Sequence, residues 1–183
     1  HGLASLLNDS DTVIVFADFS FKLMIKKMQE NLPEIKKERW ILVGGNEENY
    51  GFTRWTDFIS GLSDEEPPDA NLVDDDLYNI MYSSGTTGAP KGILHTHYVR
   101  ANYCTQFASA WRMTPESVVL HAGAIVFNGA MLDLMPWMYL GATYILHQKF
   151  DPAEVLSTIF QEKVTHIVLV PSQIVALLNH PDF

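Results

Sequence analysis

The chain has 183 residues, of which 47% are hydrophobic and 19% charged, a composition that indicates a folded domain and excludes a disordered chain. A formal net charge of −10 disfavours non-specific nucleic-acid binding. The single cysteine, Cys104, excludes an internal disulfide and favours a reducing, cytoplasmic location. Because the chain starts at His1 without a signal-peptide pattern and stops just after an expected helix, we expect it to be a segment of a longer protein.

The first 60 residues have the pattern of a strand–helix–strand unit. Residues 12–17 and 40–43 are apolar runs typical of strands that are covered on both faces, as in a parallel sheet. Between them, Ser20 can cap a helix that extends to about Asn31. We therefore interpret residues 1–60 as a βαβ-type segment, with a further short helix near Trp55.

Residues 61–76 form an acidic connection to the remainder of the chain. This segment has seven acids, no lysine or arginine, and the pair Pro67-Pro68. By contrast, residues 77–115 contain no acid but include Lys91, Arg100 and Arg112. An anionic ligand would be repelled by the first stretch and tolerated by the second.

Two strands are expected on either side of a glycine-rich stretch. Residues 77–82 and 93–97 are strand-like, and residues 98–112 favour a helix. His95 and His97 would then share one face of the second strand, but a metal site would need further ligands, so we expect a supporting role for His97.

The remaining sequence alternates strands and helices. We expect strands at 117–121, 142–146 and 165–170, and helices at 151–163 and 171–179. The segment 118–146 has one formal charge, Asp133, over a length that could cross a membrane, but glycines and Pro136 interrupt it. A buried strand–helix–strand segment is therefore favoured over a transmembrane segment, and peripheral membrane contact is left open. The alternation predicts a layered α/β fold with mostly parallel sheets flanked by helices.

The stretch Tyr82–Gly92 reads Tyr-Ser-Ser-Gly-Thr-Thr-Gly-Ala-Pro-Lys-Gly. Three glycines, four Ser and Thr hydroxyls and one lysine, without a carboxylate, suit a polyphosphate. A P-loop of the kinase or GTPase type is disfavoured, because Pro90 precedes Lys91 and Gly92 follows it. A loop of this composition can also be an ordinary turn, with Lys91 as an exposed lysine.

Followed by Ile-Leu-His-Thr-His, this stretch closely resembles the phosphate-binding loop of the adenylate-forming superfamily, which includes acyl-CoA synthetases, luciferases and peptide-synthetase adenylation domains. Weaker similarities run over the whole chain, at residues 7–10, 74–77 and 164–171. The resemblance implies that the 183 residues are part of a large N-terminal domain, with residues 77–183 carrying the phosphate loop and a substrate pocket.

The resemblance also implies roles for the residues of the loop. Hydroxyl and backbone N–H groups would bind the departing phosphates, glycines would let the backbone approach, and Lys91 would supply a positive charge. Thr86 would in addition help to hold Mg²⁺, together with a glutamate beyond this chain. The implied nucleotide-binding residues are Ser83, Ser84, Gly85, Thr86, Thr87, Gly88, Lys91 and Gly92, with Lys91 and Thr86 as the catalytic pair.

A second family feature, a histidine three residues before a glycine, is altered in this chain. Gly129 matches the glycine, but Val126 occupies the histidine position, which indicates a more apolar wall. Candidate pocket residues are Phe127, Asn128, Gly129 and Met131, together with Trp137; ordinary core packing is the alternative for each. His121 could replace the missing polar group or be a core histidine.

The implied activity is ligation of a carboxylic acid to coenzyme A through an acyl-adenylate, with ATP, Mg²⁺ and coenzyme A as cofactors and a fatty or other hydrophobic acid as substrate. An aryl-acid or amino-acid adenylating domain and a non-catalytic nucleotide-binding relative are the alternatives. The superfamily's later motifs are missing from this sequence, so we expect the 183 residues alone to be inactive. The oligomeric state cannot be inferred from the sequence.

Overall fold

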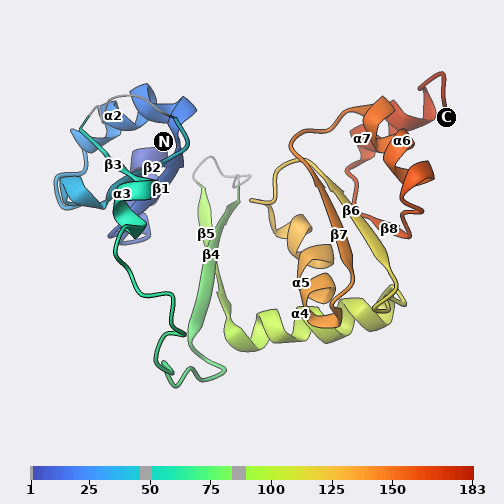
Figure 1. Ribbon diagram of the computed structural model, residues 1–183, viewed down its shortest axis with the longest axis horizontal. Coiled ribbons are helices and arrows are strands. Elements are labelled where there is room, and N and C mark those ends of the chain that lie inside the picture. The colour runs from blue at the N-terminus through green and yellow to red at the C-terminus, as the bar shows by residue number, and fades with distance from the viewer. Residues whose placement is uncertain (1, 46–50, 84–89) are drawn as a thin grey trace. The chain divides into compact units, whose positions relative to one another are not determined.

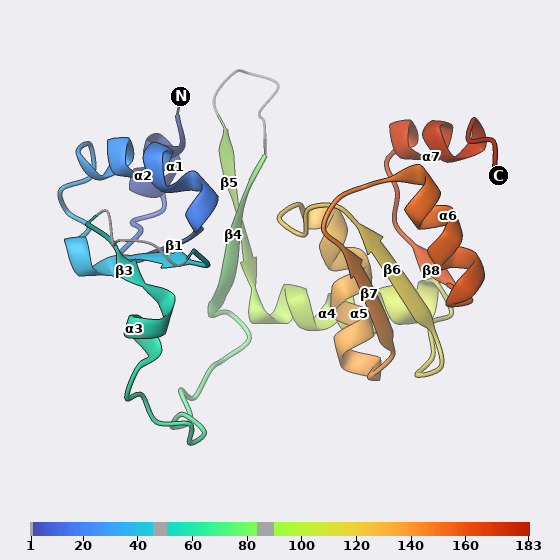
Figure 2. The same cartoon turned by 45° about the horizontal axis from the view of Figure 1, so that its top comes forward.

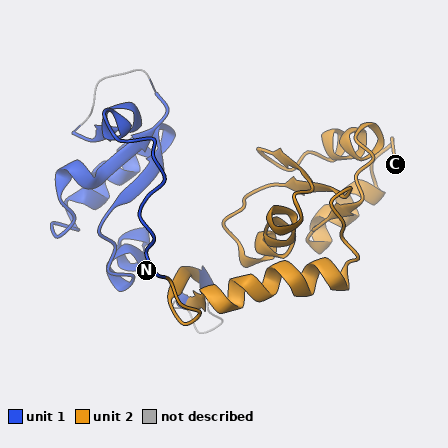
Figure 3. Ribbon diagram, turned by 60° about the horizontal axis from the view of Figure 1, so that its bottom comes forward, with its two compact units in different colours: residues 1–71, 82–92 blue, residues 72–81, 93–183 orange. Residues whose placement is uncertain are grey.

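The computed structural model describes residues 2–45, 51–83 and 90–183. The chain divides into two compact units, one formed by residues 1–71 and 82–92 and the other by residues 72–81 and 93–183 (Figure 3). Among the described residues, every helix falls short of the length or the apolarity that a membrane span requires. The cytoplasmic location stays a prediction.

The first unit is built on a parallel sheet of β1 (Val15–Asp18), β2 (Trp40–Val43) and β3 (Thr53–Arg54) (Figure 1). The helices of this unit are α1 (Leu3–Asp9), α2 (Lys22–Gln29) and α3 (Trp55–Ile59), with short 3-10 turns at Phe19–Phe21 and Lys37–Arg39. Strand β1, helix α2 and strand β2 follow one another along the chain, and the two strands pair in parallel. The predicted Ser20 cap is wrong: Asp18 caps the 3-10 turn Phe19–Phe21, its carboxylate accepting from the Ser20 N–H, and α2 begins after Phe21 without a side-chain cap.

The core of the first unit lies between α2 and β2. Ile25 and Met28 on the helix pack against Trp40 and Leu42 on the strand. Trp40 is 1% exposed and donates its indole N–H to the Ile35 carbonyl at 3.2 Å, so the largest side chain of this core keeps its polar atom paired. The apolar run at 40–43 therefore forms the expected strand, with Trp40, Ile41 and Leu42 buried and Val43 exposed.

The two strands β4 (Leu77–Ser83) and β5 (Lys91–Thr96) pair with each other, and α4 (His97–Ala110) follows directly. The expectation that His95 and His97 share one face of a strand is wrong. The strand ends at Thr96, because the Thr96 hydroxyl caps the helix by accepting from the Val99 N–H. His97 is thus the first helical residue, and its ring meets Tyr78 edge-on.

The second unit contains a parallel sheet in the order β7 (Thr143–His147), β6 (Val118–Ala122), β8 (His166–Ile167). Helix α5 (Met131–Leu140) joins β6 to β7 after a 3-10 turn at Asn128–Ala130, and α6 (Pro152–Gln161) and α7 (Pro171–Leu178) complete the unit. The predicted layered α/β fold with parallel sheets is confirmed.

Helices cover both faces of this second sheet (Figure 2). Val119 of β6 packs with α4 and α5 residues such as Ala108 and Trp137, whereas Leu120 packs with Val155 of α6 and Leu177 of α7. Successive residues of a strand face opposite sides, so β6 contributes alternately to two apolar layers. This explains why the neighbouring residues Val119 and Leu120 are both apolar.

The strand predicted at residues 165–170 is shorter in the structure. Only His166 and Ile167 pair with β6, after which the chain leaves the sheet. The N–H of Val170 instead donates to the side chain of Gln173 at 2.9 Å. The released residues Val168–Val170 form part of a cavity wall.

Asp151 caps α6, since its carboxylate accepts from the Glu154 N–H at 3.0 Å. Asp151→Ala is expected to lower the free energy of unfolding by about 1 kcal/mol, because it leaves a helix-terminal N–H without its partner. Urea denaturation measures this change. Ser157→Ala, which removes an exposed contact with Gln161 on the same helix, is the control and should cost less than half as much.

Candidate active site

The glycine-rich stretch connects two paired strands. Ser83 is the last residue of β4 and Lys91 the first of β5. The predicted position between strands, and not at the start of a helix, is therefore confirmed. Five of the predicted phosphate-binding residues lie outside the described residues: Ser84, Gly85, Thr86, Thr87 and Gly88.

The described ends of this loop are accessible. Ser83, Lys91 and Gly92 are all exposed. Within the described part of the chain, Lys91 makes no ion pair, so its ammonium group is available to an anion. Tyr82, at the start of the loop, donates its hydroxyl to the Asp9 carboxylate at 2.6 Å within the first unit. That hydrogen bond raises the pKa of Tyr82, so the residue acts as a neutral donor.

Arg100 of α4 is buried below β4 in the second unit. Its guanidinium donates to the side-chain oxygens of Asn79 and Asn128, each at 3.0 Å, and to the Met81 sulfur at 3.5 Å. The Tyr103 ring lies 4.9 Å from the guanidinium carbon. All of these partners are neutral.

His95 of β5 is buried beside the same cluster. Its Nδ1 has no hydrogen-bond partner among the residues that the structure describes, and its ring meets Tyr103 edge-on. Burial, and then the charge of Arg100, lower the pKa of His95, so the imidazole is neutral at pH 7. A second buried cation next to Arg100 is thereby avoided.

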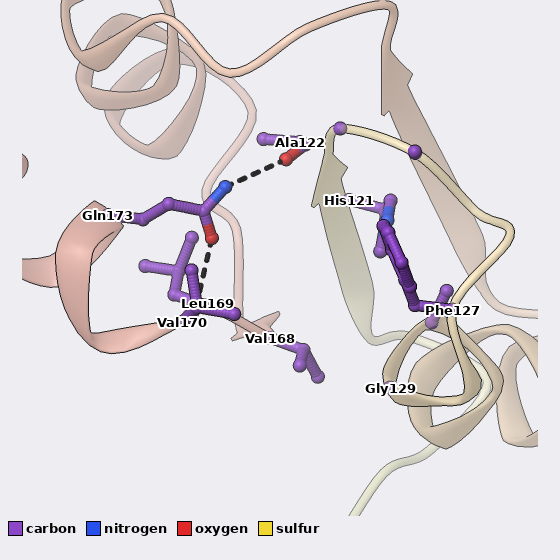
Figure 4. A pocket seen from close by; sticks show the side chains of 11 residues that line it. His121, Ala122, Phe127, Gly129, Val168, Leu169, Val170 and Gln173 are labelled. Atoms are coloured by element: carbon purple, nitrogen blue, oxygen red, sulfur yellow. Dashed lines mark hydrogen bonds between the residues drawn. The ribbon is translucent and has the colours of Figure 1, made fainter. Parts of the chain in front are cut away.

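A cavity of about 220 Å³ opens beyond the end of β6, entirely within the second unit (Figure 4). Gln173 closes one side, donating its amide to the Ala122 carbonyl at 3.3 Å while accepting from the Val170 N–H. The wall is predominantly apolar and comprises His121, Ala122, Gly123, Ala124, Phe127, Gly129, Ala130, Val168, Leu169, Val170 and Gln173. A ligand of this cavity would be held mainly by apolar contacts.

His121 is the titratable side chain in this wall. Its Nδ1 lies 3.4 Å from Asp133, which is fully buried on α5, and Tyr144 of β7 donates its hydroxyl to the other Asp133 oxygen at 3.4 Å. The Asp133 hydrogen bond raises the pKa of His121, while burial opposes this effect. In the sequence, Asp133 is the only charged residue of an apolar segment. The spacing of apolar residues does not show that it lies beside His121, because the two residues belong to different elements.

The candidate pocket residues separate into two groups. Phe127 and Gly129 line the cavity, whereas Asn128 turns to Arg100 and also donates to the Tyr103 hydroxyl at 3.2 Å. Met131 is half-buried and absent from the cavity wall. Trp137 packs on Tyr144 in the core and donates to the Ala142 carbonyl. The cavity residues Val168–Val170 and Gln173 are not indicated by the sequence, because its pattern places them in a strand and a helix.

The described residues contain no group of three or more His, Cys, Asp or Glu side chains that could hold a metal ion. Thr86, the candidate Mg²⁺ ligand, lies outside the described residues. The assignment of Mg²⁺ to Thr86 therefore stays a prediction.

The described residues thus include two paired strands on either side of a glycine-rich sequence and, in the second unit, an apolar cavity. Residues 1–183 match the family described as AMP-binding enzyme. The chain belongs to this family.

Two relatives show its place within the family. The chain is 30% identical to a Bacillus subtilis (strain 168) protein named putative acyl-CoA synthetase YngI. The alignment covers the whole of this chain and 37% of that protein. Over 121 residues, 65% of the chain, it is 38% identical to 24% of the feruloyl-CoA synthase of Amycolatopsis sp. The match thus spans 37% of the first relative's length and 24% of the second's.

The crystal structure of ATP-bound MatB from Rhodopseudomonas palustris has a similar fold. It is 25% identical, with a TM-score of 0.76, and the match covers 98% of this chain and 34% of MatB. The comparison supports the α/β fold over nearly the whole chain.

Proposed function

We propose that this chain is part of an ATP-dependent acid–CoA ligase that forms an acyl-adenylate and then an acyl-CoA thioester. The observation that carries the proposal is the loop itself. In a chain of the AMP-binding enzyme family, Ser83 and Lys91 stand at the ends of two paired strands, on either side of a glycine-, serine- and threonine-rich sequence.

In the first half-reaction, an oxygen of the substrate carboxylate attacks the α-phosphorus of ATP. The bond between the α-phosphorus and its bridging oxygen breaks, and pyrophosphate leaves. Negative charge grows on the departing phosphates, which is where the exposed ammonium of Lys91 and the Ser83 hydroxyl act. In the second half-reaction, the coenzyme A thiolate attacks the acyl carbonyl, and AMP leaves.

Mg²⁺, when bound, would offset phosphate charge, and Thr86 is the residue of this chain assigned to it. The metal requirement can be measured without any assumption about the site, by following adenylation at increasing Mg²⁺ concentration.

The acid proposed is a fatty or other hydrophobic acid, held in the cavity beyond β6. The wall of this cavity is apolar and includes Phe127, Val168 and Leu169. Such a wall favours an apolar group of the acid over a strongly polar one. An aryl acid is the second candidate, because feruloyl-CoA synthase is 38% identical over the aligned residues. Both candidates are acids with large apolar groups.

The test is acid-dependent exchange of pyrophosphate into ATP by the longer protein that contains this chain. Fatty acids of increasing length, cinnamic-type acids and amino acids form the panel. Exchange with apolar acids supports the proposal, and hydroxamate trapping identifies the adenylate. Exchange only with amino acids would contradict the substrate class, and exchange by the 183 residues alone would contradict the expected inactivity of the chain by itself.

Gly129→Val is expected to raise the KM for the preferred acid about tenfold while leaving the thermal midpoint nearly unchanged. Gly129 lines the cavity, and a Cβ added there meets no heavy atom within 4 Å, so a side chain has room to start at this position and takes up ligand space. Pyrophosphate exchange at varied acid concentration measures the change. Gly2→Val, also in open space but outside the cavity, is the matched control and should leave KM unaltered.

A further inference from the structure

Arg100 is a buried cation that has no role in the adenylation chemistry proposed above. Its exposed fraction is 1%, and its hydrogen-bonding partners are two amide oxygens and a thioether. Within the described ranges 2–45, 51–83 and 90–183, no carboxylate lies within ion-pair distance of it. Arg100 is thus held without a countercharge.

Stability alone does not account for this residue. Removing a guanidinium from water costs several kcal/mol, and neutral acceptors return only part of that cost. An apolar side chain at this helix position would avoid the penalty. What arginine offers instead is a rigid, planar fork whose donors can bind different segments at once.

The segments bound by this fork are separated in sequence. Asn79 and Met81 lie on β4, the strand that continues to Ser83 and the predicted phosphate loop. Asn128 lies between Phe127 and Gly129, two residues of the cavity wall. The second hydrogen bond of Asn128, to the Tyr103 hydroxyl, fixes the amide orientation in which its oxygen faces Arg100.

We propose that Arg100 is a positioning residue for adenylation, which holds the cavity wall at residues 127–129 in a fixed register against β4. The inference rests on the proposed function. An acid in the cavity and the strand leading into the phosphate loop then keep a constant separation. Misplacement of a reacting group by about 1 Å can cost on the order of 100-fold in rate.

The first test replaces the fork in the longer protein. Arg100→Met, of similar length but without donors, is expected to lower kcat for pyrophosphate exchange about 30-fold with a KM for ATP within about threefold of wild type. Arg100→Lys keeps the charge but cannot bind Asn79 and Asn128 together, so it should recover little of the loss. Arg112→Met removes an exposed cation near the end of the same helix and should remain within about twofold of wild type.

A double-mutant cycle first tests the link in variants that keep Arg100, and the Arg100→Met background then serves as its control. Asn79→Ala and Asn128→Ala each remove one acceptor of the fork. If Arg100 links them, the kcat of the double variant should differ from the product of the single effects by about fivefold. In the Arg100→Met background, this coupling should vanish.

The outcomes separate the two proposals. A wild-type protein without exchange on any acid overturns the proposed function and this inference with it. Wild-type exchange with additive effects of the two asparagine variants overturns this inference alone. A lowered thermal midpoint with unchanged kcat in Arg100→Met would likewise assign Arg100 a purely structural role and overturn it.

Discussion

Lys91→Ala is expected to slow acyl-adenylate formation about 100-fold while the dissociation constant of the acid stays within about twofold. The ammonium group is exposed beside the phosphate loop and carries no ion pair in the described structure, so its charge is free for the departing phosphates. Such a contact strengthens as charge develops in the transition state, and losing it lowers the rate more than it lowers ground-state binding.

Single-turnover kinetics with labelled ATP separate the rate from the binding step. Lys149→Ala removes another exposed lysine of the chain and serves as the control, with both constants expected to match wild type. If Lys91→Ala changes neither the adenylation rate nor the affinity for the acid, Lys91 is an ordinary surface lysine and its assigned role is wrong.

Asp133→Ala is expected to lower the free energy of unfolding by about 3 kcal/mol. Asp133 is fully buried and accepts hydrogen bonds from two elements, through His121 of β6 and Tyr144 of β7. Removing the carboxylate leaves the buried His121 and the half-buried Tyr144 hydroxyl without their partner. Tyr144→Phe, which removes only one hydrogen bond, should cost less than half as much in the same urea denaturation series.

The loss of stability on replacing Asp133 should also depend on pH and should be larger at low pH. The Asp133 hydrogen bond raises the pKa of His121 in the folded protein. The resulting stabilisation is complete below the unfolded histidine pKa, about 6.5, and disappears as pH rises through the higher folded value. The stability difference between wild type and Asp133→Asn should therefore be larger at pH 6 than at pH 9. Tyr144→Phe should retain the wild-type dependence, and a difference that grows with pH would contradict the His121–Asp133 assignment.

The sequence predicts the fold well where apolar periodicity and capping act locally. The apolar run at 40–43 is β2, and Asp151-Pro152 does open α6. It fails where a side chain binds a backbone N–H that the strand pattern assigns to the sheet. Val168–Val170 have strand-like side chains, but the N–H of Val170 is bonded to Gln173, and the segment borders the cavity.

The same distinction applies to the candidate site. Lys91 and Ser83 could be selected from one contiguous motif, whose predicted roles now await kinetics. By contrast, Arg100, Asn79 and Asn128 come from three separate elements and meet only in the fold. The spacing of residues along one sequence does not predict contacts between separate elements. The sequence pattern therefore suggests Asn128 as a pocket residue, whereas its side chain binds Arg100.

The alternation along β6 gives this strand a particular sensitivity to changes in length. Val119 and Leu120 serve opposite apolar layers, and His121 must face Asp133 while Ala122 packs beside Val155. Inserting or deleting one residue here would exchange the two faces of the strand. The His121 imidazole would then lie in an aliphatic layer, and the buried Asp133 carboxylate would lose its partner. Residues 61–76, which form no regular element, offer no comparable constraint. Loop grafts and insertions between members of this family should therefore be joined in that acidic connection, and β6 should be transferred whole.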